Sequence, residues 1–350
     1  MSQVGAIEPA PPQRRRGRWW RRALLGMLAL LLAITAAVAF VGYRTSNQIT
    51  RIPGVFAGLT DRPAPSTGEA AGALNVLLLG TDRRSEVSTT GTTAHSAAWE
   101  PGAQRSDTMM VLHISADRRS ASLISIPRDS WVPIPGHGTA KINAAYSLGG
   151  PTLAIATVEK LTGVRIDHLA VVDWDGYKAM IDALGGIEVT IPQTVHDSYR
   201  DHTWTAGQHH LNGAGALLYA RERSGLQAGD LDRVKRQQVV LRSLAARTVA
   251  AASSPWTAYR LGNALTQHLS VDEAWGTTEL VRLLLSVRHL SGSAIDYLTV
   301  PTAGTGMTQG QSVVWIDAPA SASLWKAVRN DRFSTWAADH PSLLTRGTVH

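Results

Sequence analysis

Residues 74–80 read LNVLLLG, a short apolar run that ends in glycine and is followed, after Thr81, by Asp82 and Arg83. A continuous apolar run of this length is typical of a strand that is buried on both faces of a sheet. Residues 108–115 (TMMVLHIS) and 121–127 (ASLISIP) are short, mainly apolar runs of the same kind. The three runs predict the centre of a buried sheet, and the rest of the chain can be organised around them.

The later segments alternate between strand and helix patterns. Strands are expected at residues 168–173, 187–192 and 295–301, and helices at 151–163, 175–186, 211–223, 231–252 and 319–329, with two more between 256 and 290. Pro151 opens the first of these helices and Gly163 ends it, which is the usual placement of these two residues. The alternation predicts an α/β domain whose central sheet is sandwiched between helical layers.

The domain organisation follows from composition. Hydrophobic residues make up 44% of the 350 residues and charged residues 17%, which is the composition of a packed domain. There is no cysteine, so disulfides and thiolate metal sites are excluded. Nothing divides residues 74–331, which we therefore take as a single domain. Residues 44–73, rich in Gly, Pro, Ser and Thr, predict a linker, and residues 332–350 a C-terminal tail.

The net charge of +7 is concentrated at the N-terminus. Residues 1–22 contain six arginines and a single acidic residue, a net charge of +5, so the remaining chain carries only +2. The basic pI therefore reflects a short tail and does not indicate nucleic-acid binding.

Residues 23–43 form an uncharged run of 21 residues. As a helix they would span about 32 Å, enough to cross a membrane. Flanking arginines stay in the cytoplasm under the positive-inside rule. The pattern predicts a cytoplasmic tail at 1–22, a single-pass signal anchor at 23–43 and an extracytoplasmic domain. The alternative is a cleaved signal peptide, whose apolar region is usually shorter.

Charged side chains gather at the ends of the expected strands. Residues 82–84 (DRR) follow the first strand, residues 105–107 (RSD) lead into the second, and Arg128 and Asp129 follow the third. Ligands of open α/β sheets bind at the carboxyl ends of strands. Residues 105–107 reach that edge only if their strand runs antiparallel to the first, so we expect a mixed sheet.

A second group of charges joins two expected helices. Arg221 and Arg223 close one helix, and Arg233 and Arg236 share a face of the next. Arginine forks match phosphate oxygens bidentately, and carboxylates are ligands of hard divalent cations. Several arginines together with two carboxylates are what a diphosphate–metal site requires.

Each of these residues also has a purely structural interpretation. Asp82 can cap a turn, Arg128 and Asp129 can form an ion pair, and Arg233 and Arg236 can be a solvated helix face. Other catalytic motifs are absent, since the sequence has neither a G-x-S-x-G elbow nor a GxxxxGK[ST] phosphate loop.

Taken in order, these motifs resemble the LytR–CpsA–Psr family. The segments that carry the resemblance are LNVLLLGTDRR (74–84), RSDTMMVLHI (105–114), SLISIPRDSWV (122–132), KINAAYSLGG (141–150), ALGGIEVTIP (183–192), LNGAGALLYARER (211–223) and GDLDRVKRQQVVL (229–241). The resemblance covers roughly residues 74–331.

The resemblance implies a sheet enclosed by helices, an apolar pocket for a polyprenyl chain and a diphosphate site at the pocket mouth. It implies catalytic roles for Asp82, Arg105, Asp107, Arg128 and Arg221. The implied diphosphate ligands are Arg84, Arg128, Lys141, Arg221, Arg223, Arg233, Arg236 and Gln237. Asp82 and Asp107 are the implied ligands of Mg²⁺ or Mn²⁺.

The implied reaction transfers a glycopolymer from a polyprenyl-pyrophosphate carrier to peptidoglycan, at the 6-hydroxyl of N-acetylmuramic acid, and forms a phosphodiester. The expected partners are this lipid-linked polymer, peptidoglycan and the cytoplasmic membrane. Two alternatives remain open, a hydrolase of the same carrier and a non-enzymatic wall- or lipid-binding module. Nucleic acid is not an expected partner, because no helix-turn-helix or basic stripe follows residue 43.

Overall fold

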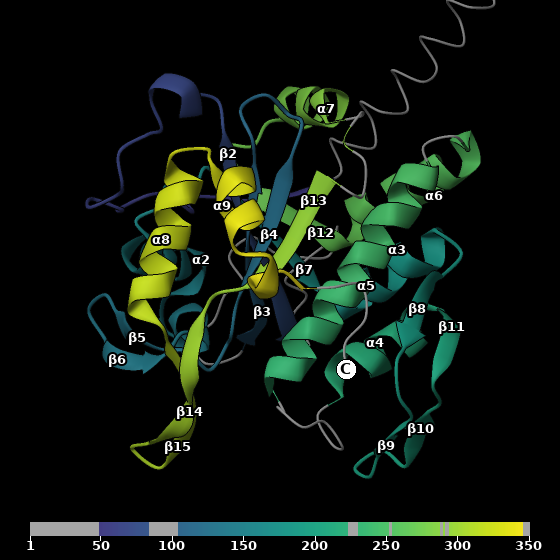
Figure 1. The fold of residues 1–350 in the computed structure, drawn as a ribbon. Helices are drawn as coiled ribbons and strands as arrows, with labels where there is room; N and C mark the ends of the chain where they lie inside the picture. Colours follow the sequence, from purple (N-terminus) through teal and green to yellow (C-terminus); the bar gives the residue numbers. More distant parts are fainter. Residues whose placement is uncertain are drawn as a thin grey trace, which may run out of the picture. The chain divides into compact units, whose positions relative to one another are not determined.

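The structure is a computed structural model that describes residues 49–83, 104–222, 230–251, 254–287, 290 and 294–345. Its centre is a seven-stranded sheet with the strand order β1-β12-β7-β2-β3-β4-β13 (Figure 1). These strands are β1 (Thr50–Ile52), β2 (Leu74–Arg83), β3 (Gln104–Ile114), β4 (Ala121–Ile126), β7 (His168–Asp173), β12 (Leu269–Asp272) and β13 (Ile295–Thr299).

The sheet is mixed, as the sequence predicted. β2 is parallel to β7, and β4 is parallel to β13, whereas β3 is antiparallel to both β2 and β4. Asp82 near the end of β2 is therefore paired with Arg105 near the start of β3, and Thr81 with Ser106. Thr81 is also paired with Asp173 at the end of β7. We call this edge of the sheet, where β2, β4, β7 and β13 end, the site edge.

Helices lie on both faces of the sheet (Figure 1). The helices are α2 (Asn143–Thr162), α3 (Trp174–Ala183), α4 (Gly213–Arg221), α5 (Asp230–Ala251), α6 (Pro255–His268), α7 (Thr277–Ser286), α8 (Ala318–Arg329) and α9 (Phe333–Asp339), with short 3-10 turns at Gly68–Ala70 and Pro341–Leu343. Side chains of α2, α8 and α9 share one large buried cluster with the sheet. Side chains of α5 and α7 contact the other face.

The two faces of the sheet are buried to different extents. Leu77, Val111 and Ile124 face the cluster with α2 and α8 and are not accessible to solvent. On the other face, Leu78 of β2 and Leu112 of β3 are only partly buried, although their strands lie in the middle of the sheet. We call this second face the open face, because Leu78 and Leu112 are only partly buried there, although their neighbours Val76 and Met110 are buried.

Four two-stranded sheets lie outside the central sheet in the described part of the chain. They are β5 (Trp131–Ile134) with β6 (Gly138–Lys141), β8 (Ile187–Ile191) with β11 (Gly207–Leu211), β9 (Val195–Asp197) with β10 (His202–Trp204), and β14 (Thr302–Thr308) with β15 (Gln311–Ile316). The strand expected at 187–192 is therefore present as β8, but it pairs with β11 and not with the central sheet.

Helix α2 begins earlier than the sequence predicted. The expected start at Pro151 coincides with a break, since Gly149 and Gly150 have non-helical backbone angles. Gly150 has a φ of 62° and a ψ of −156°, a conformation open essentially to glycine alone. The preceding turns from Asn143 place the start of the helix beside the loop that follows β4.

Packed residues extend beyond the boundaries predicted for the domain. β1 joins the central sheet, and Val55, from the predicted linker, is 2% exposed in the core. The predicted tail from residue 332 contains α9, whose Phe333 and Trp336 are buried in the same cluster. Aromatic side chains of this size stabilise the fold when buried, which explains why the segment is packed.

No helix in the described ranges is long and apolar enough to cross a membrane. The predicted tail at 1–22 and anchor at 23–43 lie outside those ranges.

A buried histidine connects the turn after α8 to the sheet. Nδ1 of His113 lies 2.8 Å from Oδ1 of Asn75, and Nε2 lies 3.0 Å from Oδ1 of Asp331. The second carboxylate oxygen of Asp331 accepts a hydrogen bond from the backbone of Ala116. Burial lowers the pKa of His113 from its ordinary value of 6.5, and the attraction of Asp331 offsets this only in part.

We expect the thermal stability to decrease as the pH falls below about 6.5, because the unfolded chain then binds a proton at His113 more readily than the folded chain. Above that pH both states are neutral at this position and the contribution is constant. Melting temperatures between about pH 5 and pH 8 measure the effect. His113→Gln should flatten the curve, and an unchanged slope in this variant would contradict the assignment.

Candidate active site

Asp107 is positioned by a β-bulge. Gly80 of β2 pairs with Thr108, but the next residue, Thr81, pairs with Ser106, so Asp107 has no partner on β2. A bulge bends its strand and redirects a side chain, and bulges are common next to active sites. Gly80 permits the close approach of the strands, since a Cβ there would lie 2.9 Å from Cβ of Thr108.

Arg128 follows β4 and contacts Asp107 directly. Its Nη1 donates to Oδ1 of Asp107 at 2.5 Å, and its Nε lies 3.7 Å from Oδ2 of Asp129. Oδ1 of Asp129 lies 3.1 Å from Nζ of Lys141. These four side chains, Asp107, Arg128, Asp129 and Lys141, form a row of alternating charge that we call the charge cluster. Each is between 14% and 22% exposed, so a ligand can reach all four.

The loop that carries Arg128 is held on two sides. The backbone of Asn143, at the start of α2, donates to the carbonyl of Arg128 at 3.1 Å. The backbone of Val314, in β15, donates to the carbonyl of Asp129 at 2.9 Å. These hydrogen bonds to α2 and β15 fix the backbone at Arg128. No flexible loop therefore has to become ordered before its guanidinium can bind a ligand at the site edge.

Arg221 and Trp174 form a second group at the site edge. The Cζ of Arg221, at the end of α4, lies 5.4 Å from the centre of the Trp174 ring. Trp174 begins α3 directly after Asp173, which is paired with Thr81. Thr81 pairs with Ser106 on its other side, so the two groups flank the same residue of β2. Two strand spacings separate β7 from β3, roughly 10 Å.

The sequence did not identify Trp174 as a site residue. The rule that found Arg128, a polar residue directly after a strand, applies equally to the end of the expected strand 168–173. Trp174 lies between the expected strand 168–173 and the expected helix 175–186, and an aromatic residue in such a position is normally part of the core. Its indole Nε1 is buried and has no hydrogen-bond partner among the described residues, and the same is true of Oγ1 of Thr81. Buried polar atoms without partners are uncommon, and a bound polar group can satisfy them.

Helix α5 brings three further predicted residues to the site edge. Nε2 of Gln238 donates to Oγ of Ser125 and to the carbonyl of Leu298, both at 2.7 Å, near the ends of β4 and β13. The preceding turns of α5 therefore project past that edge. They contain the predicted diphosphate ligands Arg233, Arg236 and Gln237, which are 4%, 3% and 7% exposed.

Arg236 has a structural partner. It forms an ion pair with Glu222, which has no solvent-exposed surface, and its Cζ lies 4.4 Å from the centre of the Tyr219 ring. Burial raises the pKa of Glu222, and the neighbouring Arg236 lowers it in part. The pair connects the end of α4 to α5.

The other predicted site residues are described only in part or not at all. Arg84 and Arg223 lie outside the described residues. For Asp82 and Arg105 the backbone is described, paired across β2 and β3, and the side chains are not. The described residues contain no group of three or more His, Asp or Glu side chains arranged to hold a metal ion.

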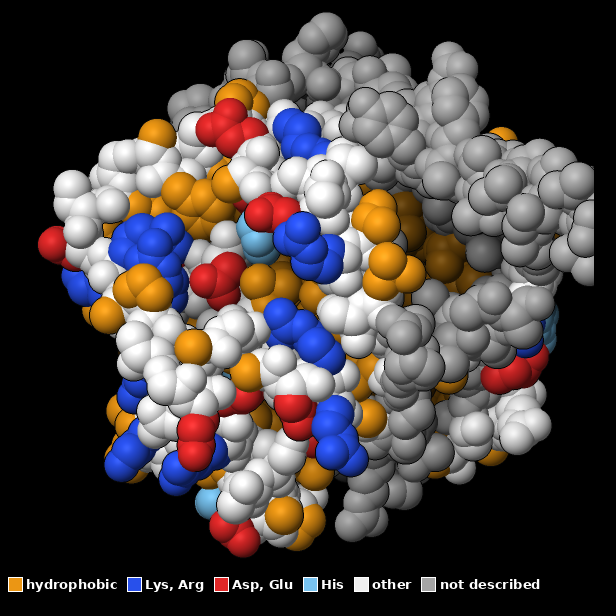
Figure 2. Space-filling model, turned by 90° about the horizontal axis from the view of Figure 1, so that it is seen from above, with side chains coloured by type: hydrophobic (Ala, Val, Ile, Leu, Met, Phe, Trp, Pro, Cys, Tyr) orange, Lys and Arg blue, Asp and Glu red, His pale blue; other side chains and the backbone are white. Residues whose placement is uncertain are grey.

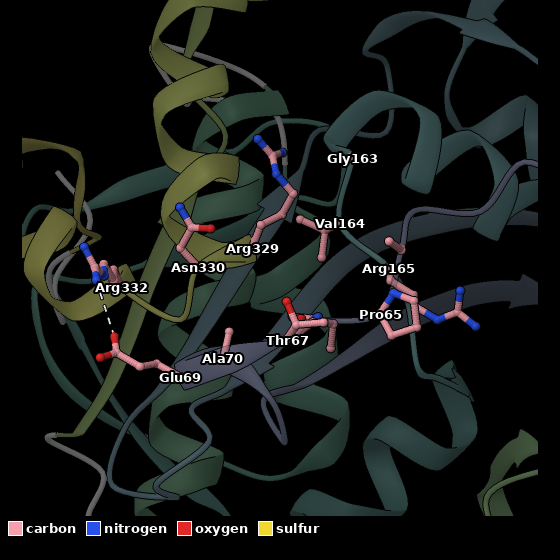
Figure 3. A pocket seen from close by; sticks show the side chains of 13 residues that line it. Pro65, Thr67, Glu69, Ala70, Gly163, Val164, Arg165, Arg329, Asn330 and Arg332 are labelled. Atoms are coloured by element: carbon pink, nitrogen blue, oxygen red, sulfur yellow. Dashed lines mark hydrogen bonds and ion pairs between the residues drawn. The ribbon is translucent and has the colours of Figure 1, made fainter.

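In the described part of the chain, one pocket lies beside the site and another lies at the opposite edge of the sheet. A pocket of about 270 Å³ adjoins Arg221 and is lined by Lys178, Arg200, Ala214, Leu217, Leu218 and Arg221. A pocket of about 420 Å³ lies at the other edge of the sheet, beside Asn75 and Arg165, and contains none of the predicted site residues (Figure 3). There Arg332 turns toward Glu69, with 3.4 Å between the charged groups.

The space-filling view adds a third feature. On the face seen from above, the surface is hollowed, and hydrophobic side chains form the floor of the hollow (Figure 2). An apolar recess of this kind is typical of sites that take apolar ligands.

Comparison with known proteins identifies the family. The LytR_cpsA_psr family model matches residues 51–330. The chain belongs to this family. The chain is 32% identical over 332 residues to the probable cell wall biosynthesis protein LcpB of Corynebacterium glutamicum, covering 91% of this chain and 77% of LcpB. It is 27% identical to the polyisoprenyl-teichoic acid–peptidoglycan teichoic acid transferase TagT of Bacillus subtilis, covering 81% and 88%.

Solved structures of LytR–CpsA–Psr proteins have the same fold. TagT bound to LIIa-WTA matches with a TM-score of 0.60 at 22% identity, covering 78% of this chain and 97% of TagT. A LytR-Csp2A-Psr enzyme from Actinomyces oris also matches with a TM-score of 0.60 at 22% identity, covering 80% and 95%. The family resemblance seen in the sequence and the mixed α/β fold that it implied are confirmed.

Proposed function

We propose that this protein transfers a glycopolymer from a polyprenyl-pyrophosphate carrier to a peptidoglycan hydroxyl. The observation that carries the proposal is the charge cluster, with Arg221 beside it, at the edge of a sheet whose open face is apolar. A polyprenyl diphosphate needs both features within one molecule. The relatives named as teichoic acid transferases support the same chemistry.

The diphosphate would bind at the charge cluster. Arg128 and Arg221 stand on the two sides of Thr81, and a guanidinium can contact two phosphate oxygens at once. Lys141 adds a third cation close to Arg128, through Asp129. In this proposal Arg128 exchanges its contact with Asp107 for phosphate oxygens when the donor binds. Arg84, Arg223, Arg233 and Gln237 remain proposed ligands.

The polyprenyl chain would lie along the open face. Leu78 and Leu112 lie on central strands and are partly buried, as are Leu241 of α5 and Leu280 of α7. Each Å² of apolar surface removed from water contributes about 25 cal/mol, so covering this face with an isoprenoid chain is favourable.

Asp82 and Asp107 are the residues that we propose to hold Mg²⁺ or Mn²⁺. The carboxylate of Asp107 is at the site edge and already neutralises a cationic group, the guanidinium of Arg128. A hard cation with one or two protein carboxylates completes its coordination with water and phosphate oxygens, which suits this sparse donor set. When bound, the cation would neutralise charge on the diphosphate.

The reaction is a phosphoryl transfer. The 6-hydroxyl of N-acetylmuramic acid attacks the phosphorus on the sugar side of the diphosphate, and polyprenyl phosphate leaves as the phosphodiester forms. The hydroxyl proton is released in the same step. Such a transition state depends on positioning and on neutralisation of charge, which Arg128 and Arg221 supply from a fixed backbone.

The proposed arrangement in the cell follows from the sequence. Residues 1–22 would lie in the cytoplasm, residues 23–43 in the membrane, and the described domain outside it, where peptidoglycan is available. The test of function is incubation of the purified full chain with a lipid-linked donor and peptidoglycan strands. Polymer joined to the strands through a phosphodiester supports transfer. Release of polymer into solution alone would favour a hydrolase, and no turnover with bound donor would favour a binding module.

Arg128→Ala should lower kcat/KM for the lipid-linked donor about 10- to 100-fold, because a charge-assisted contact contributes about 1.5–3 kcal/mol. Arg128→Lys should restore part of the loss, since lysine keeps the charge but not the two-pronged contact. Arg332→Ala, at the exposed pair in the opposite pocket, is the matched control and should leave kcat/KM unchanged. Full rescue by lysine would show that charge alone is required.

A further inference from the structure

Two small hairpins form one surface beside the charge cluster. The hairpins are β5–β6 and β14–β15, and Ser130, just before β5, forms a parallel bridge with Val314 of β15. The backbone of Val314 also donates to the carbonyl of Asp129. Figure 1 shows both hairpins in the lower left of the view. Their strands therefore join into one small layer at the site edge, which we call the hairpin layer.

The register of the hairpin layer places three side chains in a row. Trp131 of β5 is paired with Lys141 of β6. Because Ser130 is level with Val314, the residues that follow them, Trp131 and Trp315, are level with each other as well. Side chains that are level on neighbouring strands project from the same face. We call the face that carries Lys141, Trp131 and Trp315 the outer face.

The two faces of the hairpin layer have different surroundings. Val132 and Ile316, which point to the inner face, pack in the large cluster with α2 and α8. On the outer face Trp131 and Lys141 are partly exposed, and Trp315 is 38% exposed. Two indoles are therefore accessible from solvent in the same row as a side chain of the charge cluster.

The indole of Trp315 reaches over the neighbouring strand β14. Gly306 lies on the outer face, since its partner Val313 is two residues before Trp315. A Cβ at Gly306 would lie 2.9 Å from Nε1 of Trp315, closer than such atoms approach in proteins. Gly304, the partner of Trp315, would meet nothing with an added Cβ. The two glycines thus make room for the ring and leave the surface beside it open.

The surface around the indoles is polar and uncharged. Residues 302–316 contain six residues with hydroxyl or amide side chains and no charged residue. The face of an aromatic ring carries partial negative charge, so it attracts the C–H groups of a sugar ring. Hydroxyl and amide groups both donate and accept hydrogen bonds, as sugar hydroxyls do. This combination favours a neutral polysaccharide, because a polyanion needs cations along its length and a lipid surface needs a continuous apolar patch.

The hairpin layer lies on the side of the sheet away from the open face. Its inner face packs in the same cluster as Leu77, whereas the isoprenoid chain is proposed to lie over Leu78. Both sides meet at the charge cluster, where Nζ of Lys141 lies 3.1 Å from Oδ1 of Asp129. In a phosphoryl transfer the attacking and leaving oxygens are roughly in line across the phosphorus. The acceptor must therefore approach from the side opposite the leaving lipid, which is the side of the hairpin layer.

We propose that Trp131 and Trp315 bind the glycan strand of the acceptor peptidoglycan by stacking on its sugar rings. The outer face then guides the strand to the charge cluster, where its hydroxyl meets the diphosphate. This inference rests on the proposed function, because it takes the charge cluster as the diphosphate site. The two tryptophans hold the acceptor and take no part in binding the donor.

Trp315→Ala and Trp131→Ala should each raise KM for soluble peptidoglycan strands roughly 2- to 10-fold, the effect of losing one aromatic stacking contact. KM for the lipid-linked donor should stay unchanged in both variants. Trp315→Phe should keep part of the affinity, because a smaller aromatic face remains. The matched control is Trp256→Ala at the start of α6, where the tryptophan is 67% exposed and far from β15 in sequence, and it should change neither KM.

Gly306→Ala tests the geometry without removing a side chain. The added methyl group displaces the indole of Trp315 from its place over β14, so KM for the acceptor should rise as in Trp315→Ala. If Trp131→Ala does not fold, Trp315→Ala and Gly306→Ala decide the question. An unchanged acceptor KM in both of these folded variants overturns the inference.

Sedimentation of the full chain with insoluble peptidoglycan, freed of its attached polymers, measures binding without turnover. The natural chain and Trp256→Ala should sediment, and the double variant Trp131→Ala with Trp315→Ala should sediment several-fold less. A natural chain that does not bind, or a double variant that binds equally well, overturns the inference. A rise in donor KM alone would assign the outer face to the donor polymer, and a change in oligomeric state would assign it to a second copy of the chain. Both of these results also overturn the inference.

The two assays together separate this inference from the proposed function. Normal transfer by the natural chain, with tryptophan variants that behave normally, overturns the inference and leaves the function standing. Weaker sedimentation of the double variant, in a chain that releases polymer but never joins it to the strands, overturns the proposed function. The outer face then remains a peptidoglycan-binding surface.

Discussion

Replacing Asp107 by asparagine should lower the rate of glycopolymer transfer by roughly 10²- to 10³-fold, the effect of losing one electrostatic contact that acts on the transition state. Asparagine keeps the shape of the side chain at the bulge and can still accept a hydrogen bond from Arg128. The charge that would bind the divalent cation and position the diphosphate is lost. The melting temperature should change by only a few degrees, because Asp107 lies at the edge of the sheet and is partly exposed.

Turnover and melting temperature measured on the same Asp107→Asn protein show whether Asp107 has a catalytic or a structural role. A chelator should lower the turnover of the natural protein and have little further effect on the variant. The matched control is Asp129→Asn, which also touches Arg128 but whose nearer partner is Lys141, and it should be milder. Asp82→Asn should resemble Asp107→Asn. A large loss of stability with nearly normal turnover would show that Asp107 is only the structural partner of Arg128.

The largest loss of stability is expected at the ion pair between Glu222 and Arg236. Both groups are buried, so removing one leaves the other charged and without compensation, at a cost of about 3–5 kcal/mol. For a domain of this size each kcal/mol corresponds to about 2–4 °C, so Arg236→Met should lower the melting temperature by roughly 6–20 °C. Glu222→Gln should act in the same direction.

The double variant Glu222→Gln with Arg236→Met should recover part of the loss, because it removes the stranded charge. Thermal unfolding of the single and double variants measures the coupling. The affinity of the folded variants for the lipid-linked donor tests whether Arg236 also binds the diphosphate. If Arg236→Met melts at the normal temperature but no longer binds the lipid-linked donor, Arg236 is a diphosphate ligand, as the sequence predicted.

The local sequence pattern was sufficient to predict the strands at the centre of the sheet. The run at 74–80 is buried between two helical layers, and such strands are continuously apolar, so β2 was placed from composition alone. Residues 168–173 were predicted as a strand with the observed bounds of β7. β12 was missed, because its four residues lie between two helices and are too few to show a period.

The pairing of strands and the contacts between side chains were harder to predict from the sequence than local secondary structure. The alternation in β8 shows that one face is buried but does not say which strand lies beside it, so its pairing with β11 had to come from the structure. The strand-end rule brought Asp107 and Arg128 together correctly as neighbours. The sequence alone could not separate Arg221, which is partly exposed at the end of α4, from Arg236, which is buried against Glu222 in α5, because both are arginines in predicted helices.

The open face also has a consequence for the stability of the protein before a substrate binds. If the isoprenoid chain of the carrier binds at the open face, as proposed, it would complete the cover over Leu78 and Leu112, and the carrier would act as a part of the fold as well as a donor. A ligand that binds only the folded chain stabilises it by mass action. Cells short of carrier lipid would then hold a less durable enzyme, and the abundance of the transferase would follow the supply of the material it consumes.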